Sequence, residues 1–399
     1  MFLQLRKLFS SKNDSFPTLL EIFKPIYVVC RVVGLFPYNV KFKTKHCTIV
    51  HRSIYPNSLR AITALLLLFV HNVIQVRDIA LIMNEKDSAI VTQINYIVEM
   101  VLLVAACITA YCSVYMYRYK IVDILNSLAS AWVEHPTTKN SILKDLRAHV
   151  RLSLWCLFML LMLQLSVNFS RKDGVWVMYK VIMIFIYPQM LQFLVIVMYY
   201  VLVLMVVALL SNLNAVLETL GSRRIFVGGF RSSETKLTVL DLATIETLFV
   251  KVVEIKRNIN ESFQATILIT SMQSFHAIVS EAHIIYHGTL VSRTLNTHEI
   301  INFSLWIVFQ WIKIYALAHS GDRLKVETLK IGQTLHSIPM EKHDMRSLLE
   351  TQHFNSLMTY QSTDITVYGY FPLDASLMFQ IVASTAMYLI ILVQFDKKS

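Results

Sequence analysis

Three charged residues, Glu99, Lys180 and Glu281, lie within segments that are otherwise apolar. A charge inside a lipid bilayer is costly, so such residues are expected to face a cavity or one another. Charged residues in such positions are typical of ligand recognition or ion passage. The sequence contains no glycine-rich phosphate loop, His-Glu-x-x-His motif or nucleophile elbow, which argues against an enzyme. We therefore expect no enzyme, no catalytic residue and no cofactor.

Polar and aromatic side chains gather in the same segments, mainly in the halves that we place outside the cell. Together they predict an amphiphilic cavity for a small molecule. The candidate ligand contacts are Asn95, Tyr96, Glu99, Gln164, Tyr179, Lys180, Tyr187, Gln273, His276, Glu281, Trp306 and Gln310. Each of them could instead form a structural hydrogen bond between helices. His276, His283 and His287 recur at helical spacing, but no Cys or carboxylate completes a usual ligand set, so we expect no metal site.

The composition places these residues in a membrane protein. Hydrophobic residues make up 55% of the 399 residues and charged residues 16%, and the mean hydropathy is +0.53. These values exclude an ordinary soluble domain and are typical of a polytopic, all-α membrane protein. The net charge is +11, but the basic residues lie between apolar runs rather than in one patch. We therefore expect the lipid bilayer as a partner, and no nucleic acid.

Seven segments are long and apolar enough to cross a bilayer. They are residues 59–81, 90–117, 152–170, 177–217, 262–287, 300–319 and 375–395. The fourth is too long for a bilayer, so it must project beyond the lipid as helix, and only Pro188 interrupts it. An eighth segment, residues 25–40, is short and carries Arg31 and two prolines, which favours an interfacial position.

Lys and Arg predict the orientation. They are concentrated in residues 1–58 and in the second-to-third, fourth-to-fifth and sixth-to-seventh connections. By the positive-inside rule, the N-terminus is cytoplasmic and the C-terminus extracellular. The predicted division is 1–58, cytoplasmic N-terminus and interfacial segment; 59–211, spans 1–4; 212–261, cytoplasmic helical extension; 262–319, spans 5–6; 320–374, cytoplasmic anchor; and 375–399, last span and extracellular tail. The two cytoplasmic segments, 212–261 and 320–374, are interpreted either as solvated helices or as a helical bundle that joins subunits.

The end of the chain resembles a known family. Met387 to Phe395 reads Met-Tyr-Leu-Ile-Ile-Leu-Val-Gln-Phe, similar to the Thr-Tyr-(five apolar)-Gln-Phe signature of insect gustatory receptors, with Met in place of Thr. Gly369 to Asp374 resembles the family's lead-in to the last span. The resemblance implies a tetrameric, tastant-gated cation channel, homomeric or formed with other gustatory receptors. It also implies multi-pass insertion in the plasma membrane, in the dendrites of gustatory neurons.

In that architecture the last helix of each subunit lines a central pore. Here one face of that helix carries polar residues at its inner end and apolar ones further out. The expected pore and gate residues are Gln380, Ser384, Tyr388, Ile391, Gln394 and Phe395, of which Gln394 and Phe395 take the family's gate position. Alternatively, Tyr388 and Gln394 bridge helices within one subunit.

The ligand class is less well marked by the sequence. Sweet receptors of the family carry Glu after the signature Tyr, whereas this chain has Leu389, which argues against the sugar subfamily. The many aromatic residues suit a bitter compound, and a fructose-receptor-like or orphan role stays open. An odorant-receptor-type channel shares the topology, and a secondary transporter is the alternative from another class. Two glycosylation sequons begin at Asn168 and Asn302, close to the ends of spans, and their use is left open.

Overall fold

The chain was analysed as a computed structural model, which describes residues 19–36, 38–43, 46–50, 54–83, 90–134, 140–170, 174–227, 235–291, 293, 295–338, 345–361 and 364–396. Within these ranges the chain is predominantly helical. The helices are α2 (Leu19–Val32), α3 (Ile54–Met83), α4 (Ile90–Met116), α5 (Arg118–Glu134), α6 (Asn140–Phe169), α7 (Val175–Val181), α8 (Tyr187–Val227), α9 (Thr235–Tyr286), α10 (Thr297–Ser337), α11 (Met345–Tyr360) and α12 (Ala375–Asp396). The helical class predicted from the composition is confirmed.

Two short antiparallel hairpins are an addition to the expected all-α fold. β1 (Asn39–Phe42) pairs with β2 (Cys47–Val50), and β3 (Thr366–Val367) pairs with β4 (Phe371–Pro372). The second hairpin turns through Tyr368 and Gly369, both of which have positive φ, a conformation that favours glycine. It leads directly into α12, so the stretch that resembles the family's lead-in is a hairpin in this structure.

In the described part of the chain, five helices meet the length and hydropathy expected of a membrane span. They contain Tyr55–Arg77, Ile94–Met116, Ser141–Phe169, Met178–Leu220 and Thr297–Ser337, and Ala375–Ile391 of α12 is a shorter apolar helix. α9 covers the predicted fifth span and continues far beyond it. All seven predicted segments are therefore helical where they are described. The number of spans and their orientation stay predictions.

α8 is the central helix of the fold. The apolar window within Met178–Leu220 is completely buried, and α8 packs against α6, α9 and α10. A π-helical segment, η2 (Ile182–Ile186), joins α7 to α8 immediately before Tyr187 and Pro188. Proline cannot donate the backbone hydrogen bond that a regular helix needs at that point, which accounts for the irregular turn. The predicted interruption at Pro188 is confirmed.

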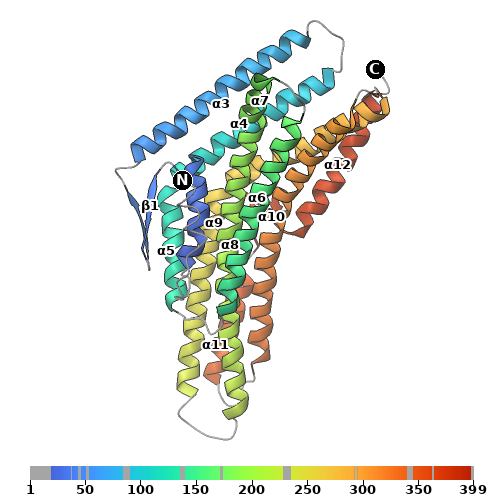
Figure 1. Cartoon of the computed structure of the whole chain (residues 1–399). Helices are drawn as coiled ribbons and strands as arrows, with labels where there is room; N and C mark the ends of the chain where they lie inside the picture. The colour runs from blue at the N-terminus through green and yellow to red at the C-terminus, as the bar shows by residue number, and fades with distance from the viewer. Residues whose placement is uncertain are drawn as a thin grey trace.

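The long helices extend the molecule in one direction. Figure 1 shows α8, α9 and α10 running side by side, with α11 beside their lower ends and α12 at one edge. Along the lower part of α9, Leu242, Ile245, Phe249 and Val252 are buried at helical spacing. Phe249 packs edge-on against Phe354 of α11, with ring centroids 5.5 Å apart. The predicted helical extension therefore belongs to a bundle rather than to isolated solvated helices.

The segment expected at the interface is helical only over residues 25–32, the second half of α2, and one face of this helix packs against the rest of the protein. Its interfacial position stays a prediction. α2 begins at Leu19, ahead of the expected boundary, and contains Pro25. Its residues Phe23, Ile26 and Cys30 are fully buried, in contact with α5, α6 and α8. The sequence underestimated this segment because burial on a neighbouring helix and insertion at an interface need the same apolar face.

Candidate functional site

A buried cation lies between three helices. Lys313 of α10 is completely buried, and its ammonium donates three hydrogen bonds. The acceptors are the side-chain oxygens of Gln189 (2.7 Å) and Gln192 (2.8 Å) on α8 and of Gln273 (3.1 Å) on α9. All three ammonium protons thus have an acceptor, which is the condition for holding a charge away from water.

The network continues to an anion on α4. Gln273 Nε2 donates to Glu99 Oε1 at 2.6 Å, and His276 Nδ1 lies within hydrogen-bond distance of Glu99 Oε2, at 3.1 Å. Gln273 therefore accepts from Lys313 and donates to Glu99, so its amide connects the cation to the anion. The network joins α4, α8, α9 and α10 through charge-assisted bonds that are strong in a medium of low dielectric constant. We call Lys313, Gln189, Gln192, Gln273, Glu99 and His276 the central polar network.

The sequence identified half of this network. Glu99, Gln273 and His276 were candidate ligand contacts, and the structure brings them together. Lys313 was missed, although it carries the same signal as Glu99, a charge inside an apolar segment. The two glutamines of α8 gave no such signal, because a neutral amide in a long apolar helix is an ordinary structural residue.

Two other candidates make smaller polar contacts. Gln310 accepts a hydrogen bond from Ser274 at 3.1 Å, close to the central polar network. Gln164 of α6 donates to Asn302 of α10 at 3.1 Å. The sequon residues Asn168 and Asn302 are both buried, and Asn168 donates to the backbone of Gln164. Glycosylation at either position would require these side chains to leave the packed interface.

The remaining aromatic candidates are distributed over several contacts. The Tyr187 and Tyr111 hydroxyls are hydrogen-bonded at 3.0 Å, which ties α8 to α4. Tyr179 stacks on Trp176 and meets His71 edge-on. Trp306 contacts Phe309 edge-on. Lys180 and Tyr96 also have interaction partners. The structure does not gather these residues into one group with the central polar network.

Asn95 and Glu281, the last two candidates, have unsatisfied polar atoms. Asn95 Nδ2 and Glu281 Oε2 are buried and lack a hydrogen-bond partner among the described residues. Asn95 lies one helical turn from Glu99 on α4, and Glu281 follows His276 on α9.

The candidate pore helix, α12, is mostly uncovered. Only one side is packed, through Leu377, Ile381 and Thr385, against α9 and α10. Among the predicted pore residues, Gln380, Ser384, Tyr388, Ile391 and Gln394 are exposed, and the side chain of Phe395 lies outside the described part of the chain. Tyr388 also meets Phe275 of α9 edge-on, with ring centroids 5.8 Å apart. The assignment of these residues to a pore stays a prediction.

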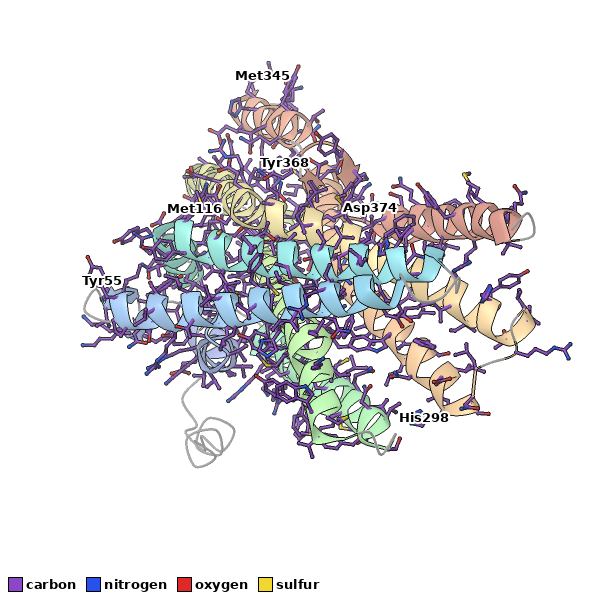
Figure 2. The ribbon with its side chains drawn as sticks, turned by 90° about the horizontal axis from the view of Figure 1, so that it is seen from above. Tyr55, Met116, His298, Met345, Tyr368 and Asp374 are labelled. Carbon is purple, nitrogen blue, oxygen red and sulfur yellow. The ribbon has the colours of Figure 1, made fainter. Side chains whose placement is uncertain are left out.

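Asp374, which is labelled in Figure 2, lies immediately before α12, and its contacts connect this end of the helix to α10. The Asp374 carboxylate accepts from the backbone N–H of Ser376 at 2.9 Å, which caps the helix, and pairs with Lys325 at 3.7 Å. Hydrogen bonding from the Ser376 hydroxyl, with help from Lys325, holds the pKa of Asp374 below its ordinary value. Gly321 of α10 lies against the Leu373 carbonyl, and a Cβ at this position would be 1.6 Å from that oxygen.

The chain matches known proteins over nearly its whole length. The sequence model described as 7tm Chemosensory receptor matches residues 23–399. Gustatory receptor 68a of Drosophila melanogaster is 24% identical over 161 residues, which are 39% of this chain and 41% of that receptor. The match thus spans about two fifths of that relative's length.

Solved structures share the fold. The insect olfactory receptor OR5 from Machilis hrabei superimposes with a TM-score of 0.68 at 14% identity, over 99% of both chains. The same receptor in complex with eugenol gives a TM-score of 0.65 at 12% identity, over 94% of this chain and 98% of that one.

Proposed function

Because the chain belongs to the 7tm chemosensory receptor family, we propose that it is an insect gustatory receptor that works as a tastant-gated cation channel. Its sequence similarity to a gustatory receptor supports the taste assignment. Its fold is that of an insect olfactory receptor, which supports the family's receptor architecture over an enzyme or a soluble binding protein. The expected site of action is the plasma membrane of gustatory neurons.

The assignment of the chain as a channel rests on the exposure of α12. An apolar helix that is packed on only one side requires further partners on its other side. In a membrane these partners are lipid or other subunits. Polar Gln380, Ser384 and Gln394 on that uncovered surface are unfavourable against lipid. Four copies of α12 around an axis would give these residues water, with Ile391 and Phe395 forming an apolar constriction near the outer end.

The membrane topology that we propose has seven spans and a cytoplasmic N-terminus. α3 and α6 expose apolar residues such as Leu66, Phe69 and Met159, which suits lipid contact. The lower parts of α8, α9 and α10, with α11, then lie in the cytoplasm and form the anchor between subunits. The distribution of Lys and Arg supports this orientation.

The ligand is proposed to enter between the outer halves of the helices, near the central polar network. OR5 forms a complex with eugenol, so a small organic molecule suits the shared architecture. Phe275 lies between Gln273 and His276 in sequence and contacts Tyr388, so a shift of α9 would reach the pore helix. A ligand opens the pore only if it binds the open state more tightly. Leu389 and the aromatic side chains support a bitter compound.

An odorant-gated channel is the second candidate. The full-length structural match to OR5 favours it, because the sequence match to the taste receptor covers only part of the chain. The two functions share a mechanism and differ in ligand. A secondary transporter, the third reading, would require solute uptake in proportion to charge moved.

Whole-cell recording tests the proposal. Cells that express this chain, alone or with other gustatory receptors, are exposed to bitter compounds, sugars and odorants while surface protein is measured. We expect an inward cation current that Gln394→Ala alters without loss of surface protein. Val382→Ala, at an exposed position of α12 outside the predicted pore residues, serves as the control. Uptake without a ligand-gated current, or the same current in Gln394→Ala, would reject the pore assignment.

A further inference from the structure

A positive charge without an acidic partner lies where α4 ends and α5 begins. Arg118 is the first residue of α5, and its guanidinium carbon lies 4.7 Å from the ring centroids of both Tyr115 and Tyr119. Its Nη1 donates to the backbone carbonyl of Tyr115 at 2.8 Å, and among the described residues no carboxylate pairs with it. The two rings and the carbonyl fix the orientation of the guanidinium, so its remaining Nη–H groups are preorganised for an acceptor from outside the chain.

The charged residues next to Arg118 differ from it in having partners. Lys120, in the same first turn of α5, pairs with Glu261 of α9, and Arg257 Nε lies 3.8 Å from the other oxygen of the same carboxylate. Glu261 is therefore shared by two cations, and the first turn of α5 contains no acidic residue. The described part of the chain thus leaves an excess of positive charge at Arg118.

An exposed apolar stripe of α4 leads to this cation. Its members recur at helical spacing and are Ile94, Val98, Val101, Ile108, Cys112 and Tyr115. From Ile94 to Tyr115 the stripe measures about 32 Å, close to the thickness of the hydrocarbon core of a bilayer. Arg118 follows one turn later, at the depth of the phospholipid headgroups, where tyrosine is an enriched residue type.

α3 adds a second exposed apolar surface at the same end. It packs along α4, and Figure 2 shows Tyr55 and Met116 at the same end of the two helices. Leu59 and Ile62 of α3, close to that end, are exposed as well. In the proposed orientation this end is cytoplasmic, and the cytoplasmic leaflet is the one that contains anionic lipids.

We propose that Arg118, positioned by Tyr115 and Tyr119, binds the phosphate of an anionic phospholipid whose acyl chains lie along the exposed stripe of α4. A guanidinium donates paired, charge-assisted hydrogen bonds to phosphate oxygens. A headgroup with net negative charge, such as phosphatidylserine, compensates Arg118 better than zwitterionic phosphatidylcholine does. The proposal goes beyond the channel assignment and uses only the proposed membrane topology.

The test uses the full chain in lipid nanodiscs and measures thermal unfolding and, by native mass spectrometry, the lipids that stay bound. The nanodiscs contain phosphatidylcholine alone or with about one fifth phosphatidylserine. Arg118→Gln removes the charge, and Arg118→Lys keeps the charge but not the planar donor group. The matched control is Arg151→Gln, which removes an exposed arginine at the inner end of the predicted third span. This control is needed because a net charge of +11 attracts anionic lipid without any specific site.

The expected result is a lipid preference that depends on Arg118. The wild-type chain should retain phosphatidylserine about fivefold more than phosphatidylcholine, and phosphatidylserine should raise its unfolding temperature. Arg118→Gln should lose most of this preference, Arg118→Lys should keep part of it, and Arg151→Gln should keep nearly all of it. Inorganic phosphate should not displace the lipid, because the acyl chains contribute to binding.

Several results would overturn the proposal. Equal retention of the two lipids by the wild-type chain, an unchanged preference in Arg118→Gln, or an equal loss in Arg151→Gln would each do so. Displacement by inorganic phosphate would indicate a soluble anion instead, and weaker assembly of Arg118→Gln in phosphatidylcholine would indicate a carboxylate of a second subunit.

A purely structural role for Arg118, through its bond to the Tyr115 carbonyl, makes a different prediction. Arg118→Gln would then lose equal stability in both kinds of nanodisc and keep the wild-type lipid preference. Neither readout uses current, so failure of this lipid site is distinguishable from failure of the channel assignment.

Discussion

α8 and α12 are both long, apolar and almost free of charge, but the structure uses them in opposite ways. The apolar window of α8 is completely buried within its own subunit. On α12, Phe379 is 77% exposed, Met387 65% and Tyr388 53%. Hydropathy alone therefore does not distinguish a helix that is buried within its own subunit from one whose surface is exposed to lipid or to other subunits.

The polar residues of the two helices follow the same division. Gln189 and Gln192 of α8 face inward and bind Lys313, whereas Gln380 and Gln394 of α12 lie on the surface of the subunit. A glutamine whose side-chain oxygen accepts a hydrogen bond inside a subunit stabilises its fold. A glutamine that is exposed on an apolar helix indicates water or another subunit at that face.

The largest expected effect comes from the polar residues around α8. Lys313→Leu should destabilise the subunit by about 3–5 kcal/mol, because it removes the donor shared by three buried glutamine oxygens and the cation that Gln273 connects to Glu99. Thermal unfolding in nanodiscs measures the change. The double variant Lys313→Leu with Glu99→Leu should recover part of the loss, whereas a loss equal to the sum of the two single-variant losses would show that the two charges act independently.

A matched truncation on each helix tests the comparison itself. Leu202→Ala on α8, at a position with no exposed surface, should cost about 2–5 kcal/mol through the cavity that it leaves. Ile390→Ala on α12, where the side chain is 59% exposed, should change subunit stability by less than about 0.5 kcal/mol and instead weaken assembly. Unfolding and native mass spectrometry separate the two effects. Equal losses of subunit stability would contradict the contrast between the helices.

Adding one methyl group at the junction between α10 and α12 should destabilise the chain. Gly321→Ala places a Cβ against the Leu373 carbonyl, so the backbone before α12 must shift, at a cost of about 2 kcal/mol or more. Gly332→Ala on the same helix meets only Met358, at an ordinary 3.6 Å, and should be neutral or slightly stabilising. Both are followed by thermal unfolding and by ligand-evoked current, and equal behaviour of the two variants would reject this close packing.

The smallest expected effect lies in the cap of α12. Asp374→Ala should cost about 1 kcal/mol, whereas Asp374→Asn keeps an acceptor for Ser376 and should cost less. The pKa of Asp374 is lowered in the folded chain, so its contribution is complete above the ordinary value of 3.8 and is lost only at lower pH. Gating measured in inside-out patches should therefore show no contribution from Asp374 between cytoplasmic pH 8 and 5. A change in that range that Asp374→Asn abolishes would contradict the assignment.

The comparison also explains which parts of the structure the sequence predicted. Apolar length and periodicity belong to each segment separately, so they predicted the helices, the interruption at Pro188 and the amphipathic lower part of α9. The central polar network depends on which helices meet. Its bonds join residues separated by 40 to 177 positions, and spacing along one helix does not reveal such pairs.

Two misses have specific physical reasons. The β3–β4 hairpin was missed because two-residue strands are too short for an alternating pattern, although Gly369 marked a turn. The ligand candidates Tyr179 and Trp306 were selected for residue type and depth, and the structure places them in separate aromatic contacts. Type and depth identify residues that suit a cavity, but helix rotation decides which of them meet.

Cysteine accessibility on α12 tests the central claim most directly. Ser384→Cys on the predicted pore face and Phe379→Cys outside it are each placed in a background with Cys112→Ala and Cys156→Ala. During ligand-evoked current, a charged methanethiosulfonate reagent is applied and its incorporation measured. The account predicts that modification blocks the current of Ser384→Cys and leaves that of Phe379→Cys unchanged. Modification of Ser384→Cys without block, no modification while the channel is open, or block at Phe379→Cys instead would contradict α12 as the pore helix.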